Sequence, residues 1–383
     1  MDRFDVGVIG AGVHGASAAY HLASMGASTT IVERTAPAQG PTGRSSGICR
    51  AYYTNPFLAA VARRSIEMLE HFSDLTGHDA GFRRTGFLFL QGADDVERVR
   101  EVTRRLDEVG VVTELLDERD LARRFPAFDR TGLAVGVWER DAGYADPAAT
   151  TLGFFGRAGE LGCVPHLGRA AVGIDSVPGG SDIVLSDGGR VTCEKVLIAA
   201  GPWTRALAAT VGADLPLTVE RHAVAVFGWN GVDPVVAHAD VGAGYYLRPD
   251  GEDQYLAGWL HPAPQVDADR FAERIGDDEV EALVRAVVTR VPHLEASSAQ
   301  GGWASLYDVS PDWQPMIGEV APGVFVDAGT SGHGFKLAPA LGRSVAELVL
   351  ERTVDPGLIE FDPFRFERGR TLEAGFGAAR ILG

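Results

Sequence analysis

The sequence predicts an α/β protein in which an open parallel sheet with flanking helices is interleaved with a second, α+β part built on an antiparallel sheet. A strand, a glycine-rich turn and a helix open the chain at residues 4–24, and a similar series recurs near its other end. Short strands at hairpin spacing and amphipathic helices fill the two segments between. The first domain is therefore predicted at 1–84, 145–217 and 303–383, and the second at 85–144 and 218–302.

Composition limits the possible partners. The 383 residues are 45% hydrophobic, which suffices for about two domains. With 35 basic and 52 acidic residues the net charge is −17, and without a dense basic cluster we expect no nucleic-acid partner. The chain lacks an apolar run of the roughly 18 residues that a membrane span needs, and it begins without a signal-peptide pattern, so we expect a cytoplasmic protein without a membrane partner. The spacing of Cys49, Cys163 and Cys193 predicts no metal site.

The first glycine-rich turn is typical of a Rossmann-like dinucleotide-binding unit. An apolar strand at residues 4–9 ends in Gly10-x-Gly12-x-x-Gly15, and a helix rich in small residues follows. Gly10 permits the tight turn, Gly12 lets backbone N–H groups approach a pyrophosphate, and Gly15 lets the helix lie close to the strand. Glu33 follows about 20 residues later, where it can accept a hydrogen bond from a ribose hydroxyl. An ordinary turn is the alternative, but the full order of elements favours the nucleotide site.

A long loop and a later strand extend this predicted site. Residues 35–56 are rich in Gly, Pro, Ser and Thr, and such long loops in compact domains are usually functional. Their backbone donors and hydroxyl groups are suited to wrap a cofactor. A buried parallel-type strand at 191–200 then runs into a turn with Gly201 and Trp203, which returns the chain to the first domain.

A second strand, glycine-rich turn and helix lie near the other end of the chain. The pattern predicts a strand at 324–328, a turn with Gly329, Gly332 and Gly334, and a helix at about 336–351. A helix N-terminus with open N–H groups stabilises negative charge, such as the charge that develops at the N1/C2=O end of a reduced flavin. Taken alone, the turn is also typical of an ordinary loop that enters a helix.

Five segments together resemble the FAD-dependent amine oxidoreductases of the D-amino acid oxidase superfamily, in the branch of sarcosine oxidase and glycine oxidase. They are the first glycine motif and residues 42–47, 200–203, 245–249 and 329–336. The resemblance implies FAD with its ADP half on the first unit and the flavin between the domains. The cofactor-binding residues it predicts are Gly10, Gly12, Val13, His14, Gly15, Glu33, Arg34, Arg44, Ser45, Ser46, Gly47, Val172, Gly201, Trp203, Gly329, Ser331, Gly332, His333, Gly334, Phe335 and Lys336.

The resemblance also implies a reaction and a substrate site. The reaction is hydride transfer from the carbon beside a substrate nitrogen to flavin N5, giving an imine that water hydrolyses. The substrate is a small amino acid, predicted to be a glycine-type secondary amine such as an N-alkylglycine. By position in the resemblance, Arg50 and Lys336 are the predicted carboxylate ligands, since Arg binds bidentately and Lys adds a point charge. Solvated surface charges are the alternative for both.

Three further residues are candidates for the substrate site. Tyr307 matches a loop that lines this site in the family, although a packed core tyrosine is an open alternative. Arg248 is a third candidate carboxylate ligand or, alternatively, part of a structural salt bridge. His261 is a candidate titrating group near the amine, but a lone histidine beside a proline is more often an exposed loop residue.

Two departures from the family pattern carry information. Sarcosine oxidases attach FAD through a cysteine two residues before the loop tyrosine, and Ser305 stands there in this chain, so FAD is predicted to be non-covalent. The same enzymes carry an oxygen-activating lysine in a strand that corresponds to residues 255–260, where this chain has none. The electron acceptor is therefore either oxygen, reduced with help from another cation, or a different molecule.

Three other functions remain open at this point. A 2-hydroxy acid or D-amino acid dehydrogenase of the same superfamily would keep the fold, and hydroxy-acid chemistry would need a base near flavin N5. A nicotinamide dehydrogenase would share the first motif but has no use for the second glycine turn. A non-enzymatic flavin protein is disfavoured by the predicted substrate-accessible flavin face.

Overall fold

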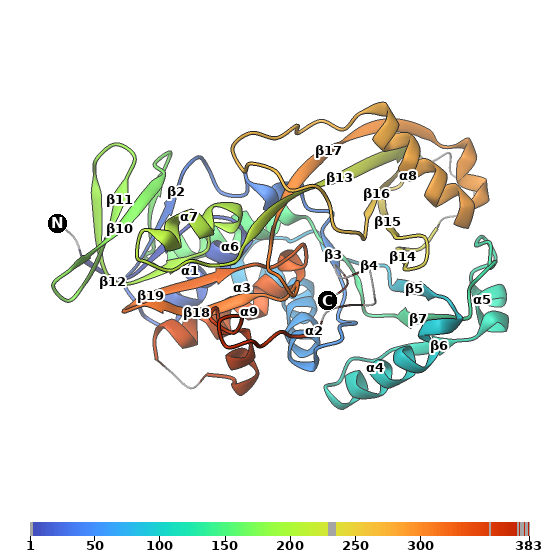
Figure 1. The fold of residues 1–383 in the computed structure, drawn as a ribbon, viewed down its shortest axis with the longest axis horizontal. Coiled ribbons are helices and arrows are strands. Elements are labelled where there is room, and N and C mark those ends of the chain that lie inside the picture. Colours follow the sequence, from blue (N-terminus) through green and yellow to red (C-terminus); the bar gives the residue numbers. More distant parts are fainter. Residues whose placement is uncertain are drawn as a thin grey trace.

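The computed structural model describes residues 3–228, 235–351 and 354–373, together with residues 375, 379 and 382. Within these residues the strands form two eight-stranded sheets and one three-stranded sheet. In Figure 1 the first large sheet lies toward the left and the second toward the right. The long strands β13 (Thr218–Gly228) and β17 (Ser298–Val309) run across the upper part of this view.

The first sheet is parallel where the two glycine turns leave it. β1 pairs in parallel with β12 and β2, and β19 pairs in parallel with β12. The carboxyl ends of these strands therefore meet at one edge of the sheet, where ligand sites of open α/β sheets form. The strands are β1 (Arg3–Ile9), β2 (Thr29–Glu33), β9 (Val164–Leu167), β10 (Ala171–Val177), β11 (Gly180–Leu185), β12 (Arg190–Ile198), β18 (Met316–Ala321) and β19 (Val324–Ala328).

The second sheet is antiparallel except where β14 pairs in parallel with β5. Its strand order is β17-β13-β16-β15-β14-β5-β7-β6, so two segments far apart in the chain contribute to it. Its other strands are β5 (Phe87–Gln91), β6 (Glu114–Leu116), β7 (Val135–Glu139), β14 (His238–Asp240), β15 (Tyr245–Asp250) and β16 (Gln254–Trp259). The small third sheet consists of β3 (Ile48–Cys49), β8 (Gly143–Tyr144) and β4 (Arg83–Arg84).

Helices cover both sheets. α1 packs against α6 and α9, and α2 packs against α9. One apolar core includes residues of these helices together with Phe87 and Phe89 of β5. The second sheet is therefore packed against the helices that cover the first sheet. The helices are α1 (Val13–Ser24), α2 (Pro56–Glu70), α3 (Phe72–Thr76), α4 (Val96–Glu108), α5 (Glu118–Arg124), α6 (Pro147–Glu160), α7 (Thr204–Ala209), α8 (Asp277–Arg290) and α9 (Gly334–Val349).

Hydroxyl groups of neighbouring helices hold α9 in place. Pro339 lies inside this helix, where proline removes a backbone hydrogen bond. Ser17 donates to Ala338 O at 2.8 Å, and Ser65 Oγ accepts the N–H of Ala340 at 3.1 Å. α1 and α2 therefore fix the position of α9, whose first turn carries the second glycine motif.

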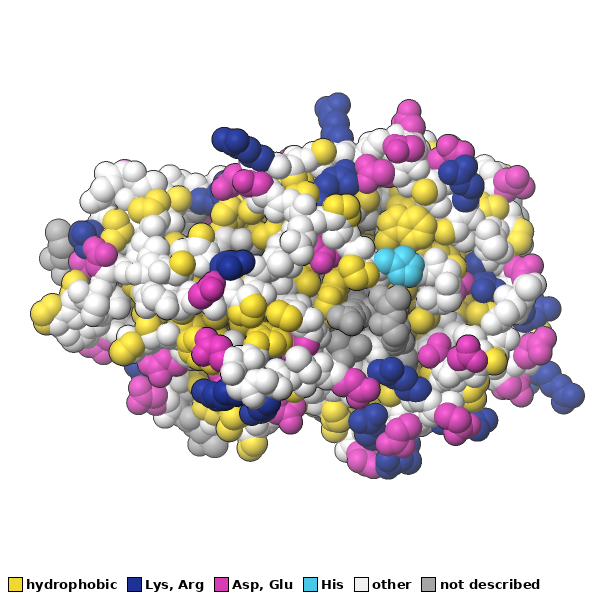
Figure 2. Space-filling model, in the orientation of Figure 1, with side chains coloured by type: hydrophobic (Ala, Val, Ile, Leu, Met, Phe, Trp, Pro, Cys, Tyr) yellow, Lys and Arg dark blue, Asp and Glu magenta, His cyan; other side chains and the backbone are white. Residues whose placement is uncertain are grey.

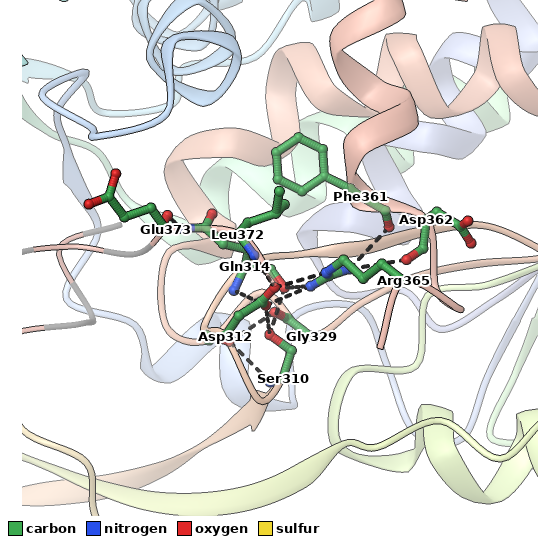
Figure 3. A network of polar contacts seen from close by, with 10 residues as sticks. Ser310, Asp312, Gln314, Gly329, Phe361, Asp362, Arg365, Leu372 and Glu373 are labelled. Carbon is green, nitrogen blue, oxygen red and sulfur yellow. Dashed lines mark hydrogen bonds and ion pairs between the residues drawn. The ribbon is translucent and has the colours of Figure 1, made fainter. Parts of the chain in front are cut away.

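The α/β fold class is confirmed, and the differences from the sequence prediction are local. α9 begins at Gly334, two residues before the start predicted for this helix. β17 crosses residue 303, so one strand of the second sheet spans a predicted domain boundary. The division into two interleaved domains stays a prediction. The C-terminal segment is anchored by Arg365, which donates to Asp312 Oδ1 at 2.6 Å and Oδ2 at 2.9 Å (Figure 3).

Candidate cofactor and substrate site

One large cavity lies where the two glycine turns meet. Its volume is about 1110 Å³, above the roughly 300–1,000 Å³ typical of small-molecule sites. The predicted cofactor residues in its lining are Gly10, Gly12, Val13, His14, Glu33, Arg34, Arg44, Ser45, Ser46, Val172, Gly201, Trp203, Gly332, Gly334 and Phe335. Those outside the lining, each next in sequence to a lining residue, are Gly15, Gly47, Gly329, Ser331, His333 and Lys336.

The first turn has the geometry of a phosphate cradle. Gly10 has φ +104°, and a Cβ there would lie 2.4 Å from the carbonyl oxygen of Ala199. A Cβ on Gly15 would lie 1.9 Å from Gly10 O, so both glycines are required by the fold. At Gly12 a Cβ would meet only Thr42 Oγ1, at 3.1 Å. A side chain at Gly12 would therefore enter the cavity where a ligand binds, whereas side chains at Gly10 and Gly15 would clash with the protein itself.

Glu33 lies at the mouth of this cradle. Its Oε2 accepts the N–H of Ala11 at 2.8 Å, and its Oε1 accepts the N–H of Thr35 at 2.9 Å. Arg34 stacks over the ring of Trp203 at 4.4 Å, and both residues donate to Asp269. Asp269, in the loop between β16 and α8, thus ties together two cavity-lining residues that follow strands of the first sheet.

His14 joins the two glycine turns directly. Its Nδ1 lies 2.8 Å from Asp327 Oδ2, at the end of β19, and its Nε2 lies 3.0 Å from Gly334 O, at the start of α9. Burial opposes a charge on this ring, but Asp327 outweighs it and the pKa of His14 is raised. The two glycine turns therefore meet at one cavity.

Asp308 fixes the backbone of the second turn, and the neighbouring Asp327 has one buried oxygen available to a ligand. Asp308 Oδ2 accepts the N–H of Gly329 at 2.6 Å. Gly332 has φ +85°, and a Cβ there would lie 2.5 Å from the ring of Tyr307. Asp327 Oδ1 is buried without a hydrogen-bond partner in the described structure, and Asp327 lines the cavity. The glycine cradle and this acceptor fit a polyhydroxylated dinucleotide such as FAD.

Arg50 and Lys336 form a buried cationic pair. Their exposed fractions are 3% and 7%, although neither lines the large cavity. Arg50 donates to Tyr52 O at 2.6 Å and to Leu382 O at 2.8 Å. Within the described part of the chain, Lys336 Nζ has no hydrogen-bond or ion-pair partner. Burial, reinforced by the Arg50 charge, lowers the pKa of Lys336 to about 7. A buried ammonium group that has no partner among the described residues, and that also feels the Arg50 charge, favours an anionic ligand.

The other three candidates lie in different surroundings. Tyr307 lines the cavity and stacks on His222, with ring centroids 3.9 Å apart. Arg248 is engaged by the protein itself, since it donates to Ser46 O and forms an ion pair with Asp250 at 2.8 Å. Arg248 therefore binds the loop at residues 35–56 through Ser46, and its ion pair with Asp250 agrees with the salt-bridge alternative. His261 is half-buried beside Trp259, with ring centroids 6.4 Å apart, and it does not line the cavity.

Sequence reasoning missed two buried residues beside Arg50. Tyr53 is fully buried, its hydroxyl has no hydrogen-bond partner among the described residues, and the Arg50 guanidinium carbon lies 4.7 Å from its ring centroid. Glu139 accepts the backbone N–H groups of Ala51 and Tyr52. The tyrosine pair at positions 52 and 53, which follows Ala51, was a usable signal, whereas nothing in the sequence placed Glu139 near Arg50.

Basic and acidic side chains are interspersed over the face drawn in Figure 2. Within the described ranges, no helix is long and apolar enough to cross a membrane. The same part of the chain contains no group of three or more His, Cys, Asp or Glu side chains placed to hold a metal ion.

The parallel sheet, the paired glycine turns and their shared cavity define a flavin-binding oxidoreductase. The chain belongs to the FAD dependent oxidoreductase family, which it matches over residues 5–348. FAD is its cofactor, and the predicted sarcosine oxidase and glycine oxidase branch is confirmed by the relatives.

Relatives extend over most of the chain. The 4-methylaminobutanoate oxidase (formaldehyde-forming) of Paenarthrobacter nicotinovorans is 28% identical over 361 residues, 90% of this chain but 43% of that protein. The chain thus spans less than half of that relative. The peroxisomal sarcosine oxidase of Mus musculus is 28% identical over 391 residues, covering 97% of both proteins. The solved L-proline dehydrogenase from P. horikoshii shares the fold, with a TM-score of 0.88 at 24% identity over 97% of this chain and 100% of that chain.

The residues that line the cavity favour non-covalent binding of FAD. Ser305 lies in its lining, and a serine hydroxyl cannot form the thioether that a cysteine would supply. The thiols of Cys49, Cys163 and Cys193 are buried, and none of these residues lines the cavity. We expect acid precipitation of the purified yellow protein to release all of the flavin into the supernatant. Flavin that stays with the pellet would contradict non-covalent binding.

Proposed function

We propose that this protein oxidises a small amino acid of the glycine type, with a secondary amine such as an N-alkylglycine as the preferred substrate. The observation that carries the proposal is the buried Lys336, which has no partner among the described residues and feels the charge of Arg50. In this proposal these cations hold the substrate's carboxylate, Arg50 as the fork-shaped donor and Lys336 as the second charge.

FAD, when bound, supplies the hydride acceptor, so the protein's own part is binding and orientation. Arg50 and Lys336 fix the carboxylate and with it the neighbouring carbon. Tyr307 stacks on His222 and lines the cavity beside the second glycine turn. The relatives support this proposal, because one is named for sarcosine and another for a methylamino acid.

The substrate class can be tested by mixing the FAD-loaded protein anaerobically with possible donors. We expect N-methylglycine or a longer N-alkylglycine to bleach the flavin faster than glycine, D-amino acids or 2-hydroxy acids. Bleaching by a 2-hydroxy acid alone would refute the proposal. The rate at which air restores the flavin colour then separates an oxidase, which we propose, from a dehydrogenase that uses another acceptor.

Tyr53 is proposed as a third donor to the carboxylate. Tyr53→Phe should weaken binding of a carboxylate ligand by about 2- to 10-fold, the value of one neutral hydrogen bond. Because the hydroxyl has no partner in the described structure, its removal should leave the thermal midpoint unchanged or slightly raised. A lower midpoint with unchanged affinity would instead assign Tyr53 to the core. Titration with acetate and a thermal melt make both measurements.

A further inference from the structure

Glu139 is a buried carboxylate that accepts hydrogen bonds from the backbone segment that follows Arg50. It is the last residue of β7 and is 2% exposed. Its Oε1 accepts the N–H of Ala51 at 2.7 Å, and its Oε2 accepts the N–H of Tyr52 at 3.0 Å. Both oxygens of one carboxylate are thus used on two consecutive backbone donors, and the second sheet holds the Arg50 segment in place.

The charge of Glu139 also interacts with the charge of Arg50. Burial raises the pKa of Glu139 to about 7, although the Ala51 N–H and the Arg50 charge act in the opposite direction. Glu139 also lines a small pocket of about 310 Å³, which gives the carboxyl access to solvent protons. The charged side chains in that lining are Arg63, Glu67 and Glu70 of α2, Arg84 of β4, and Arg140 and Asp141 after β7.

We infer that Glu139 is a positioning residue of the substrate site: its ionised carboxylate fixes the backbone at Ala51 and Tyr52 and so keeps Arg50 aligned for the substrate's carboxylate. This inference rests on the proposed function. An ionised carboxylate can accept both N–H groups. A protonated one turns an O–H donor toward one of them, so one of the two hydrogen bonds is lost.

The affinity for a carboxylate ligand should then depend on pH in two opposite ways. Glu139 is ionised above its pKa of about 7 and therefore aligns Arg50 on the alkaline side. Lys336 is protonated below its pKa of about 7 and therefore attracts the carboxylate on the acidic side. Affinity should pass through a maximum near neutral pH, with Glu139 responsible for the acid limb and Lys336 for the alkaline limb.

Acetate is the probe, and its binding to the FAD-loaded protein is followed by the change in flavin absorption between pH 5.5 and 9. At pH 8, Glu139→Gln should bind acetate about 3- to 10-fold more weakly than the unchanged protein, since one hydrogen bond is lost. The acid limb should disappear while the alkaline limb stays. Glu67→Gln is the matched control: it removes a carboxylate from the same pocket without contacting the Arg50 segment, and both limbs should remain.

Unchanged affinity and an intact acid limb in Glu139→Gln would overturn the inference. If that variant does not fold, the titration of the unchanged protein still tests the inference. Its acetate affinity should decrease as the pH is lowered below 7, and a constant affinity there would also overturn the inference. Lys336→Met in the same titration separates this result from the proposed function. If Lys336→Met loses affinity and Glu139→Gln does not, only the role of Glu139 fails; if neither loses affinity, the carboxylate site itself is wrong.

Discussion

Gly12→Val should yield a folded, colourless protein. A side chain at Gly12 meets only Thr42 Oγ1 within the protein and otherwise enters the cavity, so the fold can accept it while FAD cannot. The backbone there is extended, with φ −70° and ψ 178°, which valine adopts without strain. FAD affinity should fall by about 5- to 150-fold, because a buried overlap of this kind costs roughly 1–3 kcal/mol. Flavin content after purification and FAD titration of the apoprotein measure the effect.

The control for this variant is Gly159→Val. Gly159 lies near the end of α6, a Cβ there would have no atom within 4 Å, and the residue does not line the cavity. It should bind FAD normally. If Gly12→Val is as yellow as the control, the pyrophosphate does not lie at the first turn, and the account of cofactor binding is wrong.

Lys336→Met should keep its FAD and lose substrate. Binding of a carboxylate-bearing amine should weaken by about 10- to 100-fold, the value of a charge-assisted hydrogen bond. Since the Lys336 charge is lost as the pH rises through about 7, the unchanged protein should bind carboxylates progressively more weakly above that pH, whereas the variant should not. Acetate titration at pH 6 and pH 9 makes the comparison. Equal affinity in the two proteins at pH 6 would remove Lys336 from the site.

The same substitution should change folding stability in a defined direction. Folding lowers the pKa of Lys336 from 10.5 to about 7, so the unfolded chain binds more protons between these values. Stability of the unchanged protein should therefore rise with pH across this window, and Lys336→Met should lack that contribution. Thermal melts at pH 7 and pH 9.5 give the difference. A rise of equal size in both proteins would show that Lys336 is not the group that titrates.

Much of the nucleotide end could be predicted because its chemistry is local in the sequence. Gly10, Gly12 and Gly15 are spaced by the geometry of one turn, and Glu33 ends the next strand. The second turn could be interpreted only together with the first. Their physical link, the contacts of His14 with Asp327 and Gly334, depends on tertiary structure and has no local signature.

The substrate end was less predictable because its contacts are long-range. Arg50 and Lys336 were found by resemblance, and the structure adds that they are buried together. Glu139 is 88 positions from Ala51, and a lone glutamate at a strand end is typical of a solvated surface. Arg248 had the right charge but is held by Ser46 and Asp250, since sequence position cannot show which partners a side chain finds.

The most direct test of the account compares two amines that differ only in the carboxylate. The FAD-loaded protein is mixed anaerobically with N-methylglycine or with its methyl ester, and flavin absorption is followed in time. We predict rapid bleaching by the acid and little or none by the ester, because Arg50 and Lys336 hold the carboxylate. Equal bleaching rates with both compounds would show that this cationic pair does not select the substrate and would contradict the account.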